Sequence, residues 1–209
     1  MDESDEGIKI ILLGESGVGK TNLMNVFFDK GFEDSPESTM ASYCMESEIK
    51  YGKNSYKYFI WDTAGQEKYK GITKMFVRNT KIVLLVYSID NKLSFQAIDT
   101  WINFVKDNIE NDKYIIALIA NKSDLFESQE VSDEEGKEKA KKYGIDFLIT
   151  SALLKAKSFK NFVSQLIIKY IEMTEGDGNQ KDKNKSIKIK KETKADKNNK
   201  DKKKCCLNL

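Results

Sequence analysis

The segment GESGVGKT at residues 14–21 places glycines, a lysine and a threonine in the spacing G-x-x-x-x-G-K-[ST]. Glycines let a chain turn its backbone N–H groups inward at the start of a helix, where the helix dipole favours anions. Lys20 can reach the β- and γ-phosphates of a nucleotide, and the Thr21 hydroxyl can bind Mg²⁺. An ordinary glycine turn does not need the full pattern, so the sequence predicts a nucleoside triphosphate site. Its candidate contacts are Glu15, Ser16, Gly17, Val18, Gly19, Lys20 and Thr21.

The segment NKSD at residues 121–124 follows an apolar run and can select the base. The Asp124 carboxylate can accept from guanine N1–H and N2–H₂, whereas adenine has no donor at either position. Sites built on such pairing discriminate by about 10⁴–10⁵-fold. Alone this segment would be an ordinary polar loop, but after a phosphate loop it indicates a guanine site. A backbone N–H just after the apolar stretch 145–150 can meet guanine O6. The candidate base contacts are Asn121, Lys122, Asp124, Ser151, Ala152 and Leu153.

The segment WDTAGQE at residues 61–67 supplies groups that can act at a γ-phosphate. Asp62 can bind Mg²⁺ through water, the Gly65 N–H can approach the γ-phosphate, and Gln66 can orient the attacking water. Thr39, in the polar loop before the second expected strand, is the natural second hydroxyl ligand of Mg²⁺. Loss of the γ-phosphate would release both loops, which predicts a switch.

Secondary-structure elements must position these residues. Along the sequence, short apolar runs alternate with helical patterns, which predicts an α/β fold with a mostly parallel sheet covered on both faces. Strands are expected near 8–14, 43–51, 54–61, 81–87, 114–120 and 145–150. Helices are expected near 19–29, 92–109, 133–143 and 157–172. The second and third strands should form an antiparallel hairpin, and Ser132 with Glu135 predicts a capping box.

Composition excludes several kinds of chemistry. The 209 residues contain no histidine, which removes Ser-His-Asp and Cys-His catalysis and the commonest zinc ligand. Three cysteines are too few for a disulfide scaffold. The start, MDESDEG, has no signal-peptide character, and the apolar run 82–87 is strand-sized. We therefore expect a soluble intracellular protein.

Charge divides the chain into two expected parts, a folded domain at 1–173 and a tail at 174–209. The tail carries 12 lysines against 6 acidic residues, whereas the remainder is net acidic. Its composition predicts a flexible, disordered segment drawn to an anionic surface. The tail has no aromatic residue for base stacking, and the whole chain has one arginine, Arg78, so nucleic acid is not the expected partner.

Cys205 and Cys206 are adjacent and follow the run Lys202–Lys204. A disulfide between neighbours would be strained, and a zinc site lacks further ligands because Cys44 lies alone in an expected strand. Lipid attachment is the remaining interpretation, and the last four residues are formally a C-a-a-X sequence. Two lipid chains bind a membrane stably where one binds marginally, and each nearby lysine adds about 1 kcal/mol.

In their order and rough spacing, these motifs resemble the Ras-like small GTPases over about residues 1–172. WDTAGQEKY and LVYSID (85–90) resemble the Rab branch in particular. The resemblance implies a P-loop NTPase of the six-stranded G-domain type, GTP hydrolysis with Mg²⁺ and GTP/GDP, and a role in vesicle or membrane trafficking. It also makes Phe32 a cover for the guanine ring, although the sequence alone would equally allow a core contact.

The resemblance further implies partners and a location. These are exchange factors, GTPase-activating proteins, a GDP dissociation inhibitor or escort protein, and effectors. Both terminal cysteines would carry geranylgeranyl groups, which place the protein on the cytoplasmic face of an endomembrane, cycling with the cytosol. The G domain is expected to be a monomer.

Some residues depart from the Rab pattern. Met40-Ala41, Lys68 and FVRNT (76–80) differ from the usual residues in or near the expected switch surface, and Leu153 replaces a lysine. These changes affect partner choice rather than nucleotide chemistry. No arginine lies between Thr21 and Thr39, so hydrolysis alone should be slow, about 10⁻⁴ s⁻¹, and rise about 10³–10⁵-fold when a partner supplies one.

Three other functions fit part of the sequence: a nucleotide-binding scaffold that hydrolyses almost nothing, a P-loop kinase or ATPase, and a Ras- or Rho-type signalling GTPase. Intact Gln66 and Thr39 argue against the first, and NKSD against the second. The two terminal cysteines argue against a Ras-type protein. A Rho-type protein would carry a long insert after NKSD, and this chain has none.

Overall fold

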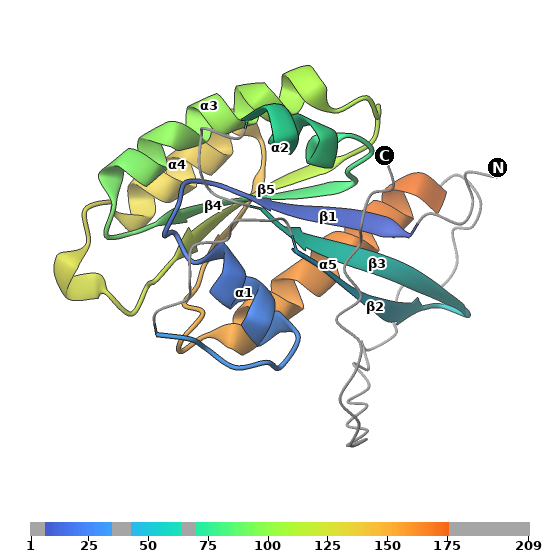
Figure 1. Ribbon diagram of the computed structural model, residues 1–209, viewed down its shortest axis with the longest axis horizontal. Coiled ribbons are helices and arrows are strands. Elements are labelled where there is room, and N and C mark those ends of the chain that lie inside the picture. Colours follow the sequence, from blue (N-terminus) through green and yellow to red (C-terminus); the bar gives the residue numbers. More distant parts are fainter. Residues whose placement is uncertain (1–6, 35–42, 64–69, 176–209) are drawn as a thin grey trace.

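A six-stranded sheet with strand order β2-β3-β1-β4-β5-β6 forms the middle of the fold (Figure 1). The computed structural model describes residues 7–34, 43–63 and 70–175. The strands are β1 (Ile8–Leu13), β2 (Tyr43–Tyr51), β3 (Asn54–Asp62), β4 (Ile82–Ser88), β5 (Ile115–Asn121) and β6 (Asp146–Ile149). The helices are α1 (Lys20–Phe27), α2 (Lys70–Val77), α3 (Lys92–Asn108), α4 (Asp133–Tyr143) and α5 (Ala156–Glu175), with a 3-10 turn η3 (Phe126–Ser128).

The sheet is parallel except for the hairpin of β2 and β3. In the hairpin Tyr51 lies opposite Asn54, and Gly52 takes φ 62° in the two-residue turn between them. Strand β1 lies between β3 and β4, so the crossover connections run outward in both directions from the middle of the sheet. In open sheets of this kind, ligands bind at the carboxyl ends of the strands beside such a reversal. The predicted fold class and the hairpin are both confirmed.

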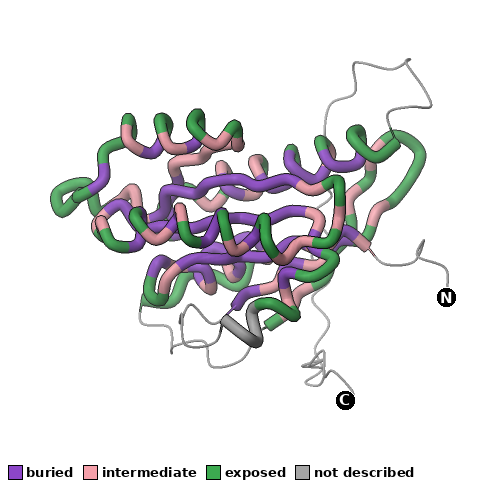
Figure 2. Tube along the Cα trace, turned by 90° about the horizontal axis from the view of Figure 1, so that it is seen from above, coloured by how far each residue is buried: buried purple, intermediate pink, exposed green. Residues whose placement is uncertain are grey.

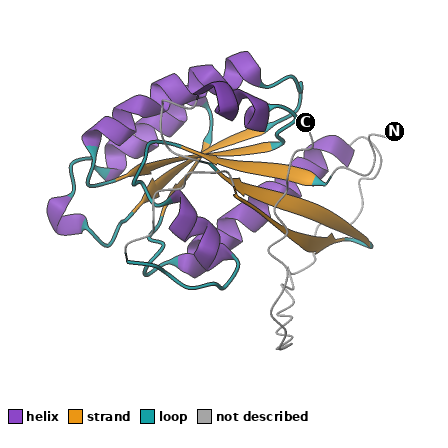
Figure 3. Ribbon diagram, in the orientation of Figure 1, coloured by secondary structure: helices purple, strands orange, loops and turns teal. Residues whose placement is uncertain are grey.

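Helices cover both faces of the sheet (Figure 3). The apolar side chains of α1 and α5 pack on one face, and those of α2, α3 and α4 pack on the other. Every residue of β4 and β5 is buried, and Figure 2 shows buried segments running through the middle of the fold. Continuous apolar strands are what a sheet covered on both faces requires. Within residues 7–34, 43–63 and 70–175, no helix has both the length and the apolar character needed to cross a bilayer.

Two helices differ from the sequence expectations. Helix α2 was not predicted from the sequence, although its eight residues are amphipathic when arranged as a helix. Packing adds to its stability: Val77 is fully buried, and the Phe76 ring lies 5.4 Å from the Trp61 ring. Helix α5 continues to Glu175, beyond the predicted end at residue 172. Its last turn is held by the β2–β3 hairpin, where the Tyr56 hydroxyl donates to Glu175 at 2.8 Å.

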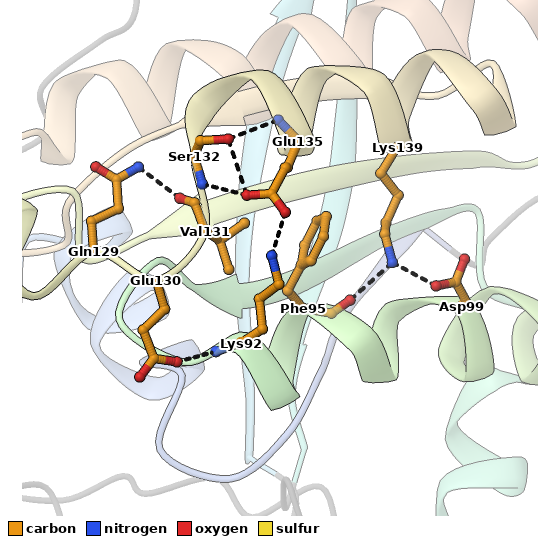
Figure 4. A network of polar contacts seen from close by, with 9 residues as sticks. All are labelled: Lys92, Phe95, Asp99, Gln129, Glu130, Val131, Ser132, Glu135 and Lys139. Atoms are coloured by element: carbon orange, nitrogen blue, oxygen red, sulfur yellow. Dashed lines mark hydrogen bonds and ion pairs between the residues drawn. The ribbon is translucent and has the colours of Figure 1, made fainter.

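A polar network joins α3 and α4 and holds the loop that follows NKSD (Figure 4). The Lys92 main-chain N–H donates to Glu130 at 2.7 Å, and the Lys92 ammonium pairs with Glu135. The hydrogen bond from Lys92, followed by those from the capping residue of α4, lowers the pKa of Glu135 to about 2. Further along both helices, Lys139 pairs with Asp99 at 2.5 Å. The predicted capping box is therefore present, and its member Glu135 also joins α4 to α3 through Lys92.

Candidate functional site

Four segments with candidate residues meet at the carboxyl edge of the sheet. They are 14–19 after β1, the end of β3 at Asp62, 121–124 at the end of β5, and 150–153 after β6. Parallel pairing brings these segments together although they are far apart in the sequence. The sequence predicted each segment by its own motif, and the sheet explains why they form a single site.

The loop after β1 is shaped by glycines at two close approaches. Gly14 has φ 144°, and a Cβ added there would lie 2.1 Å from the Val86 carbonyl oxygen. Gly19 has φ 91°, and an added Cβ would lie 2.4 Å from Nδ2 of Asn121. Neither position has room for a side chain, so the backbone can curve tightly between β1 and α1. A tight curve of this kind is what allows backbone N–H groups to converge on an anion.

Lys20 lies inside this curve. Its Nζ donates to the carbonyl oxygens of Gly14 at 2.9 Å and Glu15 at 2.8 Å, and the residue is 5% exposed. Burial lowers the pKa of Lys20 to about 8, against the opposing influence of the Asp62 and Glu15 carboxylates. A buried ammonium held by carbonyl oxygens is well placed to take a phosphate oxygen as a stronger acceptor.

Thr21 in the first turn of α1 and Asp62 at the end of β3 are brought together because β1, which precedes α1, pairs with β3. The Thr21 hydroxyl donates to Oδ2 of Asp62 at 2.7 Å, and Asp62 is 1% exposed. The next residue, Thr63, fixes the end of β3 by donating to the Leu12 carbonyl oxygen at 2.8 Å. A hydroxyl and a carboxylate are hard oxygen donors of the kind that Mg²⁺ prefers, so this pair fits the predicted ion.

Asn121 joins the phosphate loop to the loop after β6. Its Nδ2 donates to the Val18 carbonyl oxygen at 2.8 Å, and its Oδ1 accepts from the Ala152 N–H at 3.2 Å. Asn121 is 1% exposed, so both contacts are inside the protein. In the structure this amide holds together the loops on either side, and the predicted contact of Asn121 with the base stays a prediction.

Asp124 and Ser151 meet at the predicted guanine end of the site. The Ser151 hydroxyl donates to Oδ1 of Asp124 and accepts from the Leu154 N–H at 3.0 Å. The Ser123 N–H donates to the Thr150 carbonyl oxygen at 3.0 Å, which ties the same two loops through the backbone. The Asp124 carboxylate, which the sequence predicts to contact the base, is thus oriented by a neighbouring loop, a role of Ser151 that its sequence position did not reveal.

Lys122 follows Asn121 in a left-handed conformation, with φ 61°. Its ammonium lies 4.0 Å from the Asp90 carboxylate, which also accepts from the Ser88 hydroxyl. The β4–α3 turn therefore contributes an acidic residue next to the base loop. Asp90 is the last residue of LVYSID (85–90), which was considered above only for its resemblance to Rab proteins, and no role was predicted for this carboxylate.

Phe32 is 38% exposed and lies in the segment that follows α1. The neighbouring residue Glu33 is held by Asn22, whose side chain donates to the Glu33 carbonyl oxygen at 2.9 Å and accepts from its N–H at 3.0 Å. Asn22 was missed in the sequence. Its position directly after Thr21, on a helix face that is otherwise apolar, is the signal that could have identified it.

The remaining candidates fall into two groups. Ser16 and Gly17 are exposed at the loop tip, Val18 is buried, and Leu153 is about half exposed. Outside the described residues lie Thr39, Gly65, Gln66, Cys205 and Cys206, together with the departures at Met40, Ala41 and Lys68. The roles assigned to this second group remain predictions. Arg78 pairs with Glu110 at 2.9 Å, and both side chains are exposed.

Comparisons with known proteins show which family the chain belongs to. Residues 9–172 match the Ras family. The chain is 34% identical over 165 residues to Ras-related protein RABA6b of Arabidopsis thaliana, covering 79% of this chain and 72% of that protein. Two proteins of Dictyostelium discoideum are also similar. Ras-related protein Rab-11A is 36% identical over 79% of this chain and 78% of its own length. Ras-related protein Rab-11B is 39% identical over 72% of this chain and 68% of its own length.

The matches to these relatives span 68–78% of each relative's length, and the family match at 9–172 includes the loops that form the site. The chain therefore belongs to the Ras family and is a Rab-type small GTPase, an enzyme that binds GTP and GDP, hydrolyses GTP and acts in membrane trafficking.

Proposed function

We propose that this GTPase is a membrane-attached switch whose nucleotide lies across the carboxyl edge of the sheet, with its phosphates in loop 14–21 and its guanine at Asp124. The observation that carries the placement is the Lys20 ammonium, buried and held by two carbonyl oxygens of the loop. The hydroxyl–carboxylate pair of Thr21 and Asp62 lies beside it. The phosphate end of the site thus offers the Lys20 ammonium and the oxygen ligands of Thr21 and Asp62, and the base end offers the Asp124 carboxylate.

At the phosphate end, Lys20 neutralises charge on the β- and γ-phosphates while backbone N–H groups of the loop donate to their oxygens. Thr21, Asp62 and Thr39 are the residues that would hold Mg²⁺. The ion, when bound, offsets the negative charge that develops on the transferred phosphoryl group. The Thr21–Asp62 distance of 2.7 Å supports the first two members of this set, and Thr39 rests on its place in the sequence.

At the base end, Asp124 accepts from guanine N1–H and N2–H₂. Its orientation comes from the Ser151 hydroxyl, and Asn121 positions Ala152 and the phosphate loop on either side. The Ala152 N–H already donates to Asn121, so guanine O6 would share this donor or use the neighbouring Leu153 N–H. Phe32 covers the guanine ring from the segment held by Asn22.

For hydrolysis, the Gln66 amide orients the attacking water and the Gly65 N–H contacts the γ-phosphate. The chain has no arginine between Thr21 and Thr39 to stabilise the transition state, so a GTPase-activating protein supplies that charge. Loss of the γ-phosphate releases the two loops that contain Thr39 and Gln66. Effectors that bind these loops therefore distinguish GTP from GDP, and an exchange factor restores the GTP form.

The basic segment 174–209 follows the folded domain at 1–173 and contains the proposed lipid anchor near its end. Geranylgeranyl groups on Cys205 and Cys206 would hold the protein on the cytoplasmic face of an endomembrane, assisted by the run Lys202–Lys204. An escort protein or GDP dissociation inhibitor would shield the lipids during the cytosolic part of the cycle.

Nucleotide binding tests the placement of the site. Purified protein should bind a fluorescent GDP analogue in competition with GTP but not with ATP, and Lys20→Ala should lose this binding. Thr21→Ala should weaken binding in Mg²⁺ and change it little in EDTA. Equal competition by ATP, or full binding by Lys20→Ala, would overturn the assignment.

Single-turnover hydrolysis distinguishes the switch from a scaffold that only binds nucleotide. The wild-type protein should hydrolyse bound GTP slowly, and cell extract that contains an activating protein should accelerate it. Gln66→Leu should bind GTP normally and hydrolyse it more slowly without a partner. Equal intrinsic rates for Gln66→Leu and the wild type would refute the role of Gln66, and no hydrolysis under any condition would favour the scaffold.

A further inference from the structure

The phosphate loop contains an acidic residue whose side chain is bonded to a distant helix. Oε1 of Glu15 accepts a hydrogen bond from the indole N–H of Trp101 at 3.0 Å. Trp101 belongs to α3, is 3% exposed, and packs in the apolar layer on that face of the sheet. None of the motifs assigns a role to this contact.

A carboxylate in this position has two possible partners. One is the indole N–H, which is a donor only and requires an acceptor when buried. The other is the Lys20 ammonium, which would be the natural ion-pair partner of an acid in the same loop. In the structure Lys20 donates to the main-chain oxygens of Gly14 and Glu15, while the Glu15 side chain is engaged by α3.

This choice of partner has a consequence for a bound nucleotide. A carboxylate paired with Lys20 would compete with phosphate for the ammonium, and its negative charge would repel the phosphates. A carboxylate bonded to α3 leaves Lys20 available. The Glu15 carbonyl oxygen also accepts a hydrogen bond from Lys20. Glu15 therefore contacts Lys20 through its main chain and Trp101 through its side chain.

We propose that Trp101 is a positioning residue for the phosphate loop: its indole N–H holds the Glu15 carboxylate on α3 and so prevents Glu15 from competing with the nucleotide for Lys20. This inference rests on the proposed location of the phosphates, and it adds a contact from outside the loop that controls how long the nucleotide stays bound. Glu15 acts through Lys20, and Trp101 acts through Glu15.

The test is a double-mutant cycle on the rate of GDP release, with the wild type, Trp101→Phe, Glu15→Gln and the double variant, each loaded with a fluorescent GDP analogue. Trp101→Phe keeps an aromatic ring but removes the donor, so GDP release should become roughly tenfold faster, as expected for loss of a hydrogen bond to a charged group. Glu15→Gln cannot form an ion pair with Lys20, so the double variant should return to within about twofold of Glu15→Gln alone.

Two results would overturn the proposal. One is release from Trp101→Phe at the wild-type rate. The other is the same acceleration by Trp101→Phe whether or not Glu15→Gln is also present, which would mean that Trp101 acts through packing alone. Ile98→Val is the matched control, since it removes one methyl group from a fully buried position of the same helix. It should lower thermal stability without changing GDP release.

A second measurement avoids any substitution in the core of α3. In protein labelled with ¹⁵N-tryptophan, Glu15→Ala should shift the indole resonance of Trp101 and leave that of Trp61 in place. An unchanged Trp101 resonance would show that the bond is absent in solution, which overturns the proposal. Failure of Lys20→Ala to lose nucleotide binding would instead contradict the phosphate-loop assignment, so the two failures are distinguishable.

Discussion

At the scale of single residues, the site depends on a few polar side chains whose partners are other parts of the site. Ser151 holds Asp124, Asn121 holds Ala152 and the Val18 carbonyl group, and Trp101 holds Glu15. A buried polar group that loses its partner costs more than the hydrogen bond contributed, so each of these residues has a single favourable arrangement. These hydrogen bonds therefore hold the loops of the site in a defined shape.

Asp124→Asn should weaken GTP binding and shift preference toward xanthine nucleotides. The carboxylate pairs with two donors of guanine, whereas an amide pairs with the donor and acceptor pattern of xanthine. The measurement is competition of GTP and XTP against a fluorescent GDP analogue, with Glu127→Gln, an exposed acid of η3, as the control. Unchanged GTP affinity in Asp124→Asn would contradict the guanine assignment.

Lys20 should make the stability of the nucleotide-free protein depend on pH. Its pKa is about 8 in the folded protein and has its ordinary value, 10.5, when the chain is unfolded. Between these values the unfolded state binds more protons, so the free energy of unfolding should rise with pH. Below about pH 8 the buried Lys20 is charged and lowers the stability of the folded protein. Between about pH 8 and pH 9.5 we expect the free energy of unfolding to increase by roughly 2 kcal/mol.

Urea unfolding of the nucleotide-free protein at these two pH values measures the gain. Lys20→Met has no titrating group at this position, so it should lose the gain while other groups continue to titrate. The same slope in Lys20→Met and the wild type would show that Lys20 is not its source.

At the scale of elements, helix α4 is fitted closely against the sheet. A Cβ added at Gly136 would lie 2.5 Å from the Tyr87 hydroxyl oxygen and 2.6 Å from the Phe147 ring. The sequence gives no reason to expect this, because a glycine inside a helix normally lowers stability relative to alanine. Helix α4 lies so close to β4 and β6 that Gly136 has no room for a side chain, which is the physical reason for a glycine at this position.

Gly136→Ala should therefore destabilise the protein by about 1–3 kcal/mol, as overpacked cores do, despite the better helix propensity of alanine. Glu138→Ala changes an exposed position of the same helix and should stay within about 0.5 kcal/mol of the wild type. Chemical denaturation compares the two variants. Stabilisation by Gly136→Ala would show that α4 can move away from the sheet.

Local patterns explain why much of this protein could be predicted and why some of it could not. The phosphate loop, NKSD, the hairpin and the capping box are each encoded within a few neighbouring residues. The contacts that complete the site join residues far apart in the sequence: Asn121 and Val18 are 103 residues apart, and Trp101 and Glu15 are 86 apart. Helix α2 is a different case: its amphipathic pattern is local and was overlooked, whereas its contact between Phe76 and Trp61 on β3 could not be read from neighbouring residues.

At the scale of the whole molecule, the nucleotide site and the root of the basic segment lie at different places on the fold. The site is at the carboxyl edge of the sheet, whereas the end of α5 is fastened to the far hairpin by bonds from Tyr51 to Glu172 and from Tyr56 to Glu175. The last described residue of the chain is therefore fixed relative to the sheet. Attachment through residues beyond it would leave the site free to bind its partners.

Changing both Cys205 and Cys206 to Ser should make the protein cytosolic while GTP binding and hydrolysis stay intact. Changing one should leave weak attachment that high salt disrupts, because a single lipid chain depends on the lysines beside it. Membrane fractionation at low and high salt, with intact-mass analysis of the C-terminal peptide, measures both effects. Cys44→Ser is the control and should stay on membranes. Pelleting of the double variant, or a native peptide without isoprenoid, would contradict the lipid anchor.

Strand β2, at one edge of the sheet, has a consequence for solubility. The outer side of an edge strand offers backbone N–H and C=O groups to any chain that can pair with it, which is a route to aggregation. Along β2 the residues Glu46, Glu48 and Lys50 are exposed. A second copy approaching this edge would have to bring its own charges beside these and strip water from them. We therefore expect charge on this edge to keep concentrated protein in solution, and its removal to cause turbidity before any loss of catalysis.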